Sequence, residues 1–162
     1  MGYGLEFHGL SLNVLGERLR ASTDAAARLI IAGGGAVDEE AAVEVVQAIR
    51  ELAEPIDMVE HSSSGGDWFR EEVFGGLVAE AIGADLAEHL LDRPLEGIVW
   101  DEYPSVGWAD NAELRDAVAR LDALGEDPAG ELPLEEAMIV GTVFAAVRKA
   151  VADGVDLVTV YS

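Results

Sequence analysis

The fold that this sequence predicts depends on residues 134–161, LEEAMIVGTVFAAVRKAVADGVDLVTVY. From 134 to 151 the residues are almost all apolar, and a helix that is apolar nearly all round is buried on several sides. Glutamates in its first turn and Arg148 and Lys149 in its last suit the helix dipole, and Gly154 can take the left-handed cap. The β-branched run 157–161 predicts a strand. We therefore expect a helix enclosed by protein on most sides that leads into a terminal strand.

The rest of the chain predicts a single α+β domain over residues 1–162. Alternation with a period of two indicates a strand over 3–7 that pairs with the C-terminal strand, and a third short strand is expected over 97–100. We expect a small sheet that includes both end strands, packed with about five to six helices around a buried C-terminal helix. The expected helices cover 12–20, 23–31, 39–53, 67–82, 85–91 and 111–124, and the expected loops include 61–66 and 103–108.

The charge is strongly acidic, with 32 Asp and Glu against 10 Lys and Arg, a net charge of −22. Nucleic acid and anionic lipid are bound by clusters of Lys and Arg, and the sequence contains no such cluster. We therefore expect no nucleic-acid partner and no membrane association. The acids are spread along the chain, which favours a general role in solubility, while an acidic face that docks a basic protein is the sharper alternative.

Localisation and cofactor use follow from residues that the chain lacks. There is no cysteine, which excludes disulfides, thiolate metal sites and a cysteine nucleophile. The longest apolar run falls short of the roughly 20 residues of a membrane span, and the N-terminus does not resemble a signal peptide. We expect a cytoplasmic protein with no cofactor and no bound metal.

Candidate catalytic and ligand-binding groups are sparse. The Ser/Gly loop at 62–66 precedes a helix but is followed by acids that would repel a phosphate. Asp85, His89 and Asp92 lie about one turn apart and are possible metal ligands on one helix face. The same spacing is typical of a solvated helix face in an acidic chain. No serine lies in a nucleophile elbow, so no catalytic residue is assigned.

The segment 100–110, WDEYPSVGWAD, is the strongest candidate for a binding surface. It combines two of the three tryptophans, one tyrosine and three acids, and exposed aromatic residues supply much of the contact energy in protein interfaces. The predicted contact residues are Trp100, Asp101, Glu102, Tyr103, Trp108 and Asp110. The alternative is that Trp100 and Trp108 anchor the segment to the core.

Three segments resemble the small bacterial YfbM-like proteins of unknown function. They are 1–7 (MGYGLEF), 103–108 (YPSVGW) and 144–161 (FAAVRKAVADGVDLVTVY), about a third of the chain. The resemblance implies a single α+β domain with a short N-terminal strand and a final helix–Gly–strand unit. It implies no activity and transfers no catalytic residue.

The functional hypothesis from the sequence is a non-enzymatic acidic domain that docks a basic protein, with an immunity-type or regulatory role. Its anchors would be the aromatic residues of 100–110, with the acids steering the encounter. A small-molecule binder or hydrolase-like enzyme with a cleft of carboxylates and His61 or His89 is the second hypothesis. A structural or oligomer-forming domain is the third, because the sequence does not predict the oligomeric state.

Overall fold

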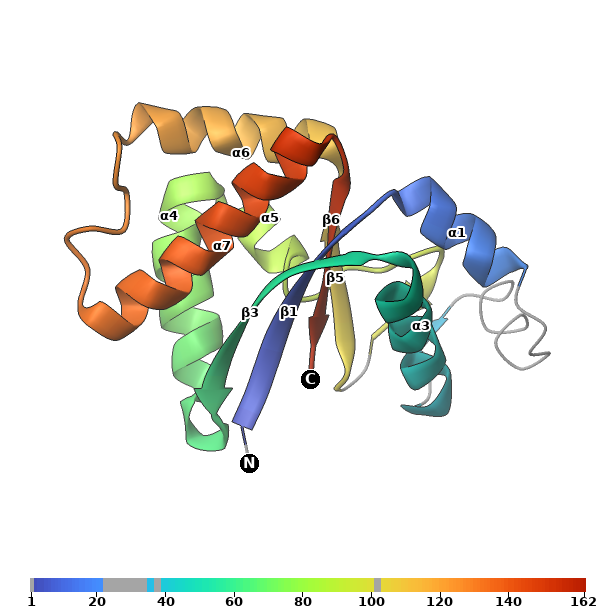
Figure 1. Cartoon of the computed structure of the whole chain (residues 1–162). Coiled ribbons are helices and arrows are strands. Elements are labelled where there is room, and N and C mark those ends of the chain that lie inside the picture. The colour runs from blue at the N-terminus through green and yellow to red at the C-terminus, as the bar shows by residue number, and fades with distance from the viewer. Residues whose placement is uncertain (1, 22–34, 37–38, 101–102) are drawn as a thin grey trace.

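The computed structural model describes residues 2–21, 35–36, 39–100 and 103–162, and its main feature is an antiparallel sheet (Figure 1). The four strands lie in the order β3-β1-β6-β5. Their bounds are β3 Glu54–Ser62, β1 Gly2–Leu10, β6 Asp156–Tyr161 and β5 Ser105–Ala109. A short parallel ladder pairs β2 (Gly35–Ala36) with β4 (Ile98–Val99). The predicted α+β fold, with both end strands in one sheet, is confirmed.

The pairing of β1 with β6 places the two end strands in the middle of the sheet. Leu5 lies opposite Tyr161 and Leu10 opposite Asp156. Because side chains alternate along a strand, Leu5 and Phe7 enter one hydrophobic core while Leu10 enters the other. A sheet buried on both faces needs cover on both faces, and the helices provide it.

The helices form a layer on each side of the sheet (Figure 1). On one side lie α1 (Leu12–Arg20) and α3 (Glu39–Leu52). On the other lie η2, a π-helix (Trp68–Val78) preceded by the 3₁₀ turn η1 (Ser63–Gly65), then α4 (Ala79–Ile82), α5 (Ala84–His89), α6 (Asn111–Ala123) and α7 (Leu134–Asp153). These elements confirm the predicted helices except for 23–31, which lies outside the described residues.

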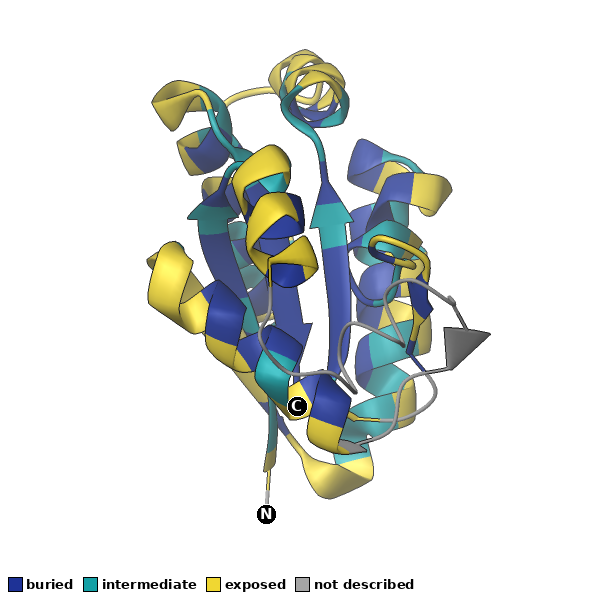
Figure 2. Cartoon of the chain, turned by 90° about the vertical axis from the view of Figure 1, so that its right-hand side faces the viewer, coloured by how far each residue is buried: buried dark blue, intermediate teal, exposed yellow. Residues whose placement is uncertain are grey.

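The C-terminal helix α7 is buried along one face only, which corrects the expectation that it is enclosed on most sides. Val143, Phe144 and Val147 are buried against the sheet and its neighbours, whereas Leu134 is 78 % and Met138 65 % exposed. Figure 2 shows the same division, with buried strands between helices whose outer sides are exposed. The sequence pattern was misleading because the outer flank is itself apolar: the large Leu134 and Met138 and the small Ala145 are all exposed, and an apolar residue need not be buried.

Two segments predicted as loops contain strand residues. Residues 61–66 contain the end of β3 and the turn η1, and residues 103–108 run into β5. Both strands lie at edges of the sheet. The outer edge of β5 is covered, because Arg93 N donates to Val106 O at 3.0 Å and Ser105 Oγ donates to Leu91 O at 3.1 Å.

The start of α6 is formed as its sequence predicts. Asp110 Oδ1 accepts from Glu113 N at 2.9 Å, and Glu113 Oε2 accepts from Asp110 N at 3.0 Å, which completes a capping box. The Glu113 carboxylate also pairs with Arg93 at 2.9 Å. Burial opposes ionisation of Glu113, but these hydrogen bonds and the Arg93 charge outweigh it and lower its pKa.

Candidate binding surface

The two tryptophans of the segment 100–110 hold the chain rather than project from it. Trp100 is buried, and its Nε1–H donates to Arg93 O at 2.9 Å. Trp108 is half-buried on β5, and its Nε1–H donates to Pro94 O at 3.0 Å. The Arg93 guanidinium lies 3.5 Å from the Trp108 ring centre. Both indoles therefore fix the segment around residues 93 and 94, the anchoring role that was the alternative for them.

Of the three acids predicted as contacts, the structure describes only Asp110. Asp110 is half-buried and occupied as the cap of α6. Asp101 and Glu102 lie outside the described residues.

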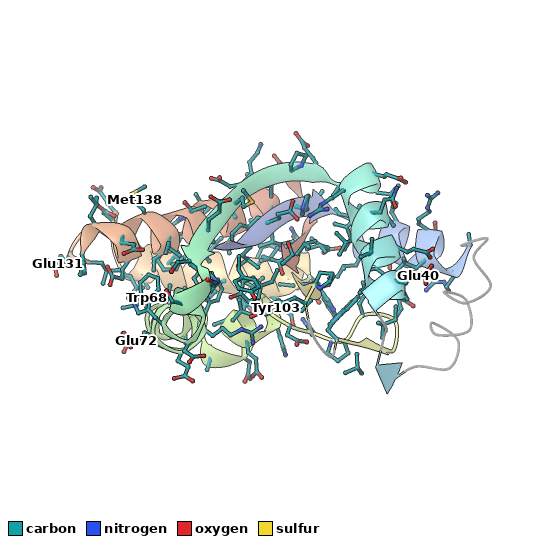
Figure 3. The ribbon with its side chains drawn as sticks, turned by 90° about the horizontal axis from the view of Figure 1, so that it is seen from below. Glu40, Trp68, Glu72, Tyr103, Glu131 and Met138 are labelled. Atoms are coloured by element: carbon teal, nitrogen blue, oxygen red, sulfur yellow. The ribbon has the colours of Figure 1, made fainter. Side chains whose placement is uncertain are left out.

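Tyr103, 38 % exposed, lies in a cluster that contains all three tyrosines of the chain. Its ring centre is 4.8 Å from that of Tyr3 on β1 and 4.9 Å from that of Tyr161 on β6. His61 on β3 stacks on Phe69 of η2 at 4.5 Å. Seen from below, Tyr103 lies near the middle of this end of the molecule, with Trp68 on the adjacent π-helix (Figure 3). The cluster is thus assembled from four separate elements and the segment before β5.

A chain of hydrogen bonds fixes the polar groups inside this cluster. His61 Nδ1 lies 2.7 Å from Ser62 O, and His61 Nε2 lies 2.6 Å from the Tyr161 hydroxyl. A carbonyl can only accept, so Nδ1 carries the hydrogen, and in the neutral ring Nε2 is then the acceptor. The Tyr161 hydroxyl therefore donates to the neutral ring of His61, and it also hydrogen-bonds with Tyr103 and Arg70.

Arg70 of η2 covers the cluster from one side. Its Nε–H donates to the Tyr103 hydroxyl at 3.2 Å, and its guanidinium carbon lies 5.0 Å from the Tyr161 ring centre and 5.4 Å from that of Tyr103. Burial would lower the pKa of Arg70, but its interactions with Tyr103 and then Tyr161 outweigh this and raise it. Asp92 is half-buried near Arg70, and burial raises the pKa of its carboxyl against the opposing charge of Arg70.

Because of Tyr161, the free energy of unfolding is expected to fall as pH rises through the alkaline range. Burial, followed by the neighbouring Tyr103, raises its pKa above the ordinary value of 10.0. Above that pH the phenol of the unfolded chain ionises while the folded one stays protonated, so the unfolded state binds fewer protons and stability falls as pH rises. We expect urea unfolding from about pH 8 to about pH 11 to show this loss. The slope should be shallower for Tyr161→Phe, and equal slopes for the two proteins would contradict the prediction.

A concave surface that encloses a volume of about 650 Å³ adjoins the tyrosine cluster, and Tyr3 and His61 belong to both. Glu6 on its wall pairs with Arg50 at 2.8 Å. Glu60 and Glu135 also line it and are exposed, and neither forms an ion pair with another described residue. The lining residues are Gly2, Tyr3, Gly4, Glu6, Arg50, Met58, Glu60, His61, Ser62, Glu135 and Ser162. The surface beside the tyrosines is thus acidic.

His8 follows Glu6 by two residues on β1 and is buried. Its two ring nitrogens have no hydrogen-bond partner among the described residues. Its Nε2 is 3.9 Å from Glu6 Oε2, too far for a hydrogen bond. Burial lowers the pKa of His8, the charge of Glu6 opposes this, and Arg50 reinforces it. His8 is therefore held in its neutral form.

A second hollow, of about 450 Å³, lies between α5 and α6. Asp85, His89, Glu113, Asp116 and Arg120 contribute its polar side chains. Its lining includes His89 but not His61, which hydrogen-bonds Tyr161 at the other surface.

Within the part of the chain that the structure describes, no three His, Asp or Glu side chains are placed to hold a metal ion. None of the helices in that part is long and apolar enough to cross a membrane.

Compared with known proteins, the chain matches no family model, no curated protein and no solved structure. The resemblance of its three segments to the YfbM-like proteins remains a prediction.

Sequence reasoning missed most of this surface: of its five residues it named Tyr103 as a contact and His61 only for the second hypothesis, and it did not name Tyr3, Arg70 or Tyr161. The one available signal was that the two strands expected to pair each carry a tyrosine. No signal placed His61 or Arg70 beside the tyrosines, because 61–66 was predicted as a loop and Arg70 as part of a helix with no known orientation.

Proposed function

We propose that this chain is a non-enzymatic acidic domain that binds a basic protein partner, in an immunity-type or regulatory role. The observation that carries the proposal is a partly exposed tyrosine, Tyr103, seated on packed aromatic rings beside an acidic concave surface. Rigid aromatic residues with an Arg neighbour are typical of the few positions that dominate binding energy.

The charge of the chain supports a basic partner over a neutral or acidic one. A net charge of −22 attracts a basic protein over long range and raises its association rate. Glu60 and Glu135 line the contact itself, next to Tyr3, and form no ion pair with another described residue. We place the interface at the tyrosine end because aromatic residues and exposed acids adjoin there.

Capture from the native cell extract on the immobilised chain tests the proposal. We expect a basic protein that the wild type retains at low salt and releases as salt screens the charges. Tyr103→Ala should weaken its binding by about 30-fold, the loss typical of a dominant contact. Glu60→Lys should also weaken it, since the substitution reverses a charge at the surface.

Matched controls use exposed positions elsewhere. Leu124→Ala is the control for Tyr103→Ala, because Leu124 follows α6 and is 55 % exposed. Glu126→Lys, in the loop after α6, is the control for Glu60→Lys. Both should retain the partner as the wild type does. The proposal fails if no protein is retained specifically, or if the Tyr103 and Glu60 variants bind as well as their controls.

The hollow between α5 and α6 favours one second candidate, a small-molecule-binding or hydrolase-like function that uses carboxylates and His89. Chemical shifts of His89 during a screen of small metabolites test this function. A compound that shifts His89 in the wild type and not in an Asp116→Asn variant would support it, and a screen without any shift at His89 would remove it.

A further inference from the structure

The two edges of the main sheet differ in what lies beside them. At β5, the chain around Arg93 covers the edge, because Arg93 N donates to Val106 O at 3.0 Å. At the other edge, β3 pairs with β1 on its inner side, and no other described strand pairs with it. Met58 on β3 is 47 % exposed and Glu60 is also exposed, and Figure 1 shows β3 on the outer side of the sheet. Such an edge can accept an added strand.

The backbone of Glu60 points to this outer edge. On β1, Gly4 N donates to Ser162 O at 2.7 Å and Gly4 O accepts from Ser162 N at 2.9 Å, so both groups point towards β6. Backbone groups alternate between the two neighbours of a strand, so Leu5 bonds to β3, where it lies opposite Val59. Glu60, the next residue of β3, therefore directs its N–H and C=O away from β1.

The accessible part of the edge is the stretch 58–60. Met58 precedes Val59 and, by the same alternation, also directs its backbone outward. Asp57 Oδ1 accepts from Met58 N at 2.8 Å, which leaves the Met58 C=O for a new partner. Towards the start of the strand, Pro55 and a shift in the register of β1 against β3 interrupt the edge, and both features hinder strand addition.

The charge of this edge selects its occupant. β3 carries Glu54, Asp57 and Glu60 and has no Lys or Arg. Glu60 also lines the concave surface beside the tyrosines, together with Glu6 and Glu135. A second copy of this chain would bring its own three acids against those of β3, and each copy carries a net charge of −22. A basic extended segment is therefore the complementary occupant.

We propose that the docking partner adds a basic extended segment to β3 at 58–60, as a further strand of the sheet. The inference rests on the proposed function and states how the partner is held. In an antiparallel arrangement, like that of the sheet itself, the partner residue opposite Glu60 exchanges two backbone hydrogen bonds with it, and its side chain lies beside the carboxylate. Lys or Arg suits that position. The residue two places further along lies beside Met58, which favours an apolar side chain.

A short synthetic peptide with blocked ends tests the edge on the whole chain. Lysine and valine occupy every second position in turn, which places both on one face, and threonine fills the positions between. The readout is hydrogen exchange of the Glu60 amide, which lies at the open edge. With the peptide at about ten times its Kd, this exchange should slow about tenfold. The amide of Val59, which bonds to β1, is the internal reference and should change much less.

Methylated peptides distinguish strand addition from attraction between charges. N-methylation of a lysine and the next valine removes the N–H groups that face Glu60 and Met58, so binding should weaken by about tenfold. N-methylation of two threonines is the matched control, because their N–H groups point away from β3, and it should leave the Kd unchanged. The two methylated peptides carry the same charge. Equal Kd values for them would overturn the proposal.

Variants of the chain test the same contact from its other side. Glu60→Gln removes only the charge and should weaken binding of the peptide by about threefold. Glu60→Pro also removes the outward N–H, which an edge strand tolerates, and should weaken binding by about a further fivefold. Glu126→Gln, in the exposed loop after α6, is the control and should bind as the wild type does. Equal Kd values for the two Glu60 variants would overturn the proposal. Should Glu60→Pro fail to fold, the methylated peptides decide the matter on the wild type.

Failure of this inference is separable from failure of the proposed function. The peptide measurements need no natural partner, whereas capture from the cell extract does. A captured partner that leaves exchange of the Glu60 amide unchanged would overturn the β3 edge as its site, while the proposed function stands. Protection of Glu60 by the peptide without any captured partner would support the edge as a site for basic strands and remove the proposed function.

Discussion

Replacing Gly107 of β5 with alanine is expected to lower the free energy of unfolding by about 3 kcal/mol or more. A Cβ on Gly107 would lie 2.5 Å from His89 O, 2.6 Å from the carbonyl carbon of Leu90 and 2.6 Å from Thr159 Oγ1. Two of these atoms belong to the backbone at the end of α5, so rotating a side chain cannot relieve their contacts with the new Cβ. Urea unfolding followed by circular dichroism measures the loss.

A glycine-to-alanine substitution in α7 should instead raise the free energy of unfolding. A Cβ on Gly141 meets no atom within 4 Å, and the residue lies in the middle of a helix. Gly141→Ala is expected to raise the free energy of unfolding by about 0.5 to 1 kcal/mol, because alanine restricts the unfolded chain and favours a helix. If Gly107→Ala costs no more than a few tenths of a kcal/mol, the close approach of α5 to β5 is wrong.

Thr159→Val is expected to cost about 2 to 4 kcal/mol although the two side chains have nearly the same shape. The buried Thr159 hydroxyl donates to Leu90 O at 2.7 Å and accepts from Gly107 N at 3.1 Å. Valine leaves both backbone groups buried without this partner, and such groups are costly. The hydroxyl therefore joins β6, β5 and the end of α5 at one point.

Thr159→Ser is the matched control for this prediction. Serine keeps the hydroxyl and loses only a methyl group, so its cost should be about 1 kcal/mol. The measurement is again urea unfolding, with the denaturant slope checked to be equal in both variants. A valine variant as stable as the serine variant would mean that the two hydrogen bonds do not hold α5 to the sheet.

The two edge strands show where the sequence pattern stopped being informative. A strand with one buried face alternates clearly, but β3 is exposed along most of its length, and only Val59 and His61 are buried. Pro104, just before β5, and Gly107 within it are residue types typical of turns. Gly107 is instead required by the backbone of α5 that packs against it, a cause that lies outside the strand.

The candidate surface was even less predictable. The segment 100–110 was singled out for its aromatic residues, yet the hydrogen bonds of Trp100 and Trp108 to residues 93 and 94 make both of them anchors. Tyr103 gains its neighbours from β1, β6 and η2. Such a convergence depends on strand order and register, which no local spacing of residues records.

The sequence by itself determined what depends on neighbours along the chain: the capping box of α6, the Gly154 cap of α7, the alternating pattern of β1 and the β-branched run of β6. The tertiary structure alone decided which apolar residues face water, as along the Leu134 flank of α7, and which distant side chains meet, as in the tyrosine cluster. The physical reason is that caps and periodicity arise from interactions within a few residues, whereas burial depends on what packs against each face.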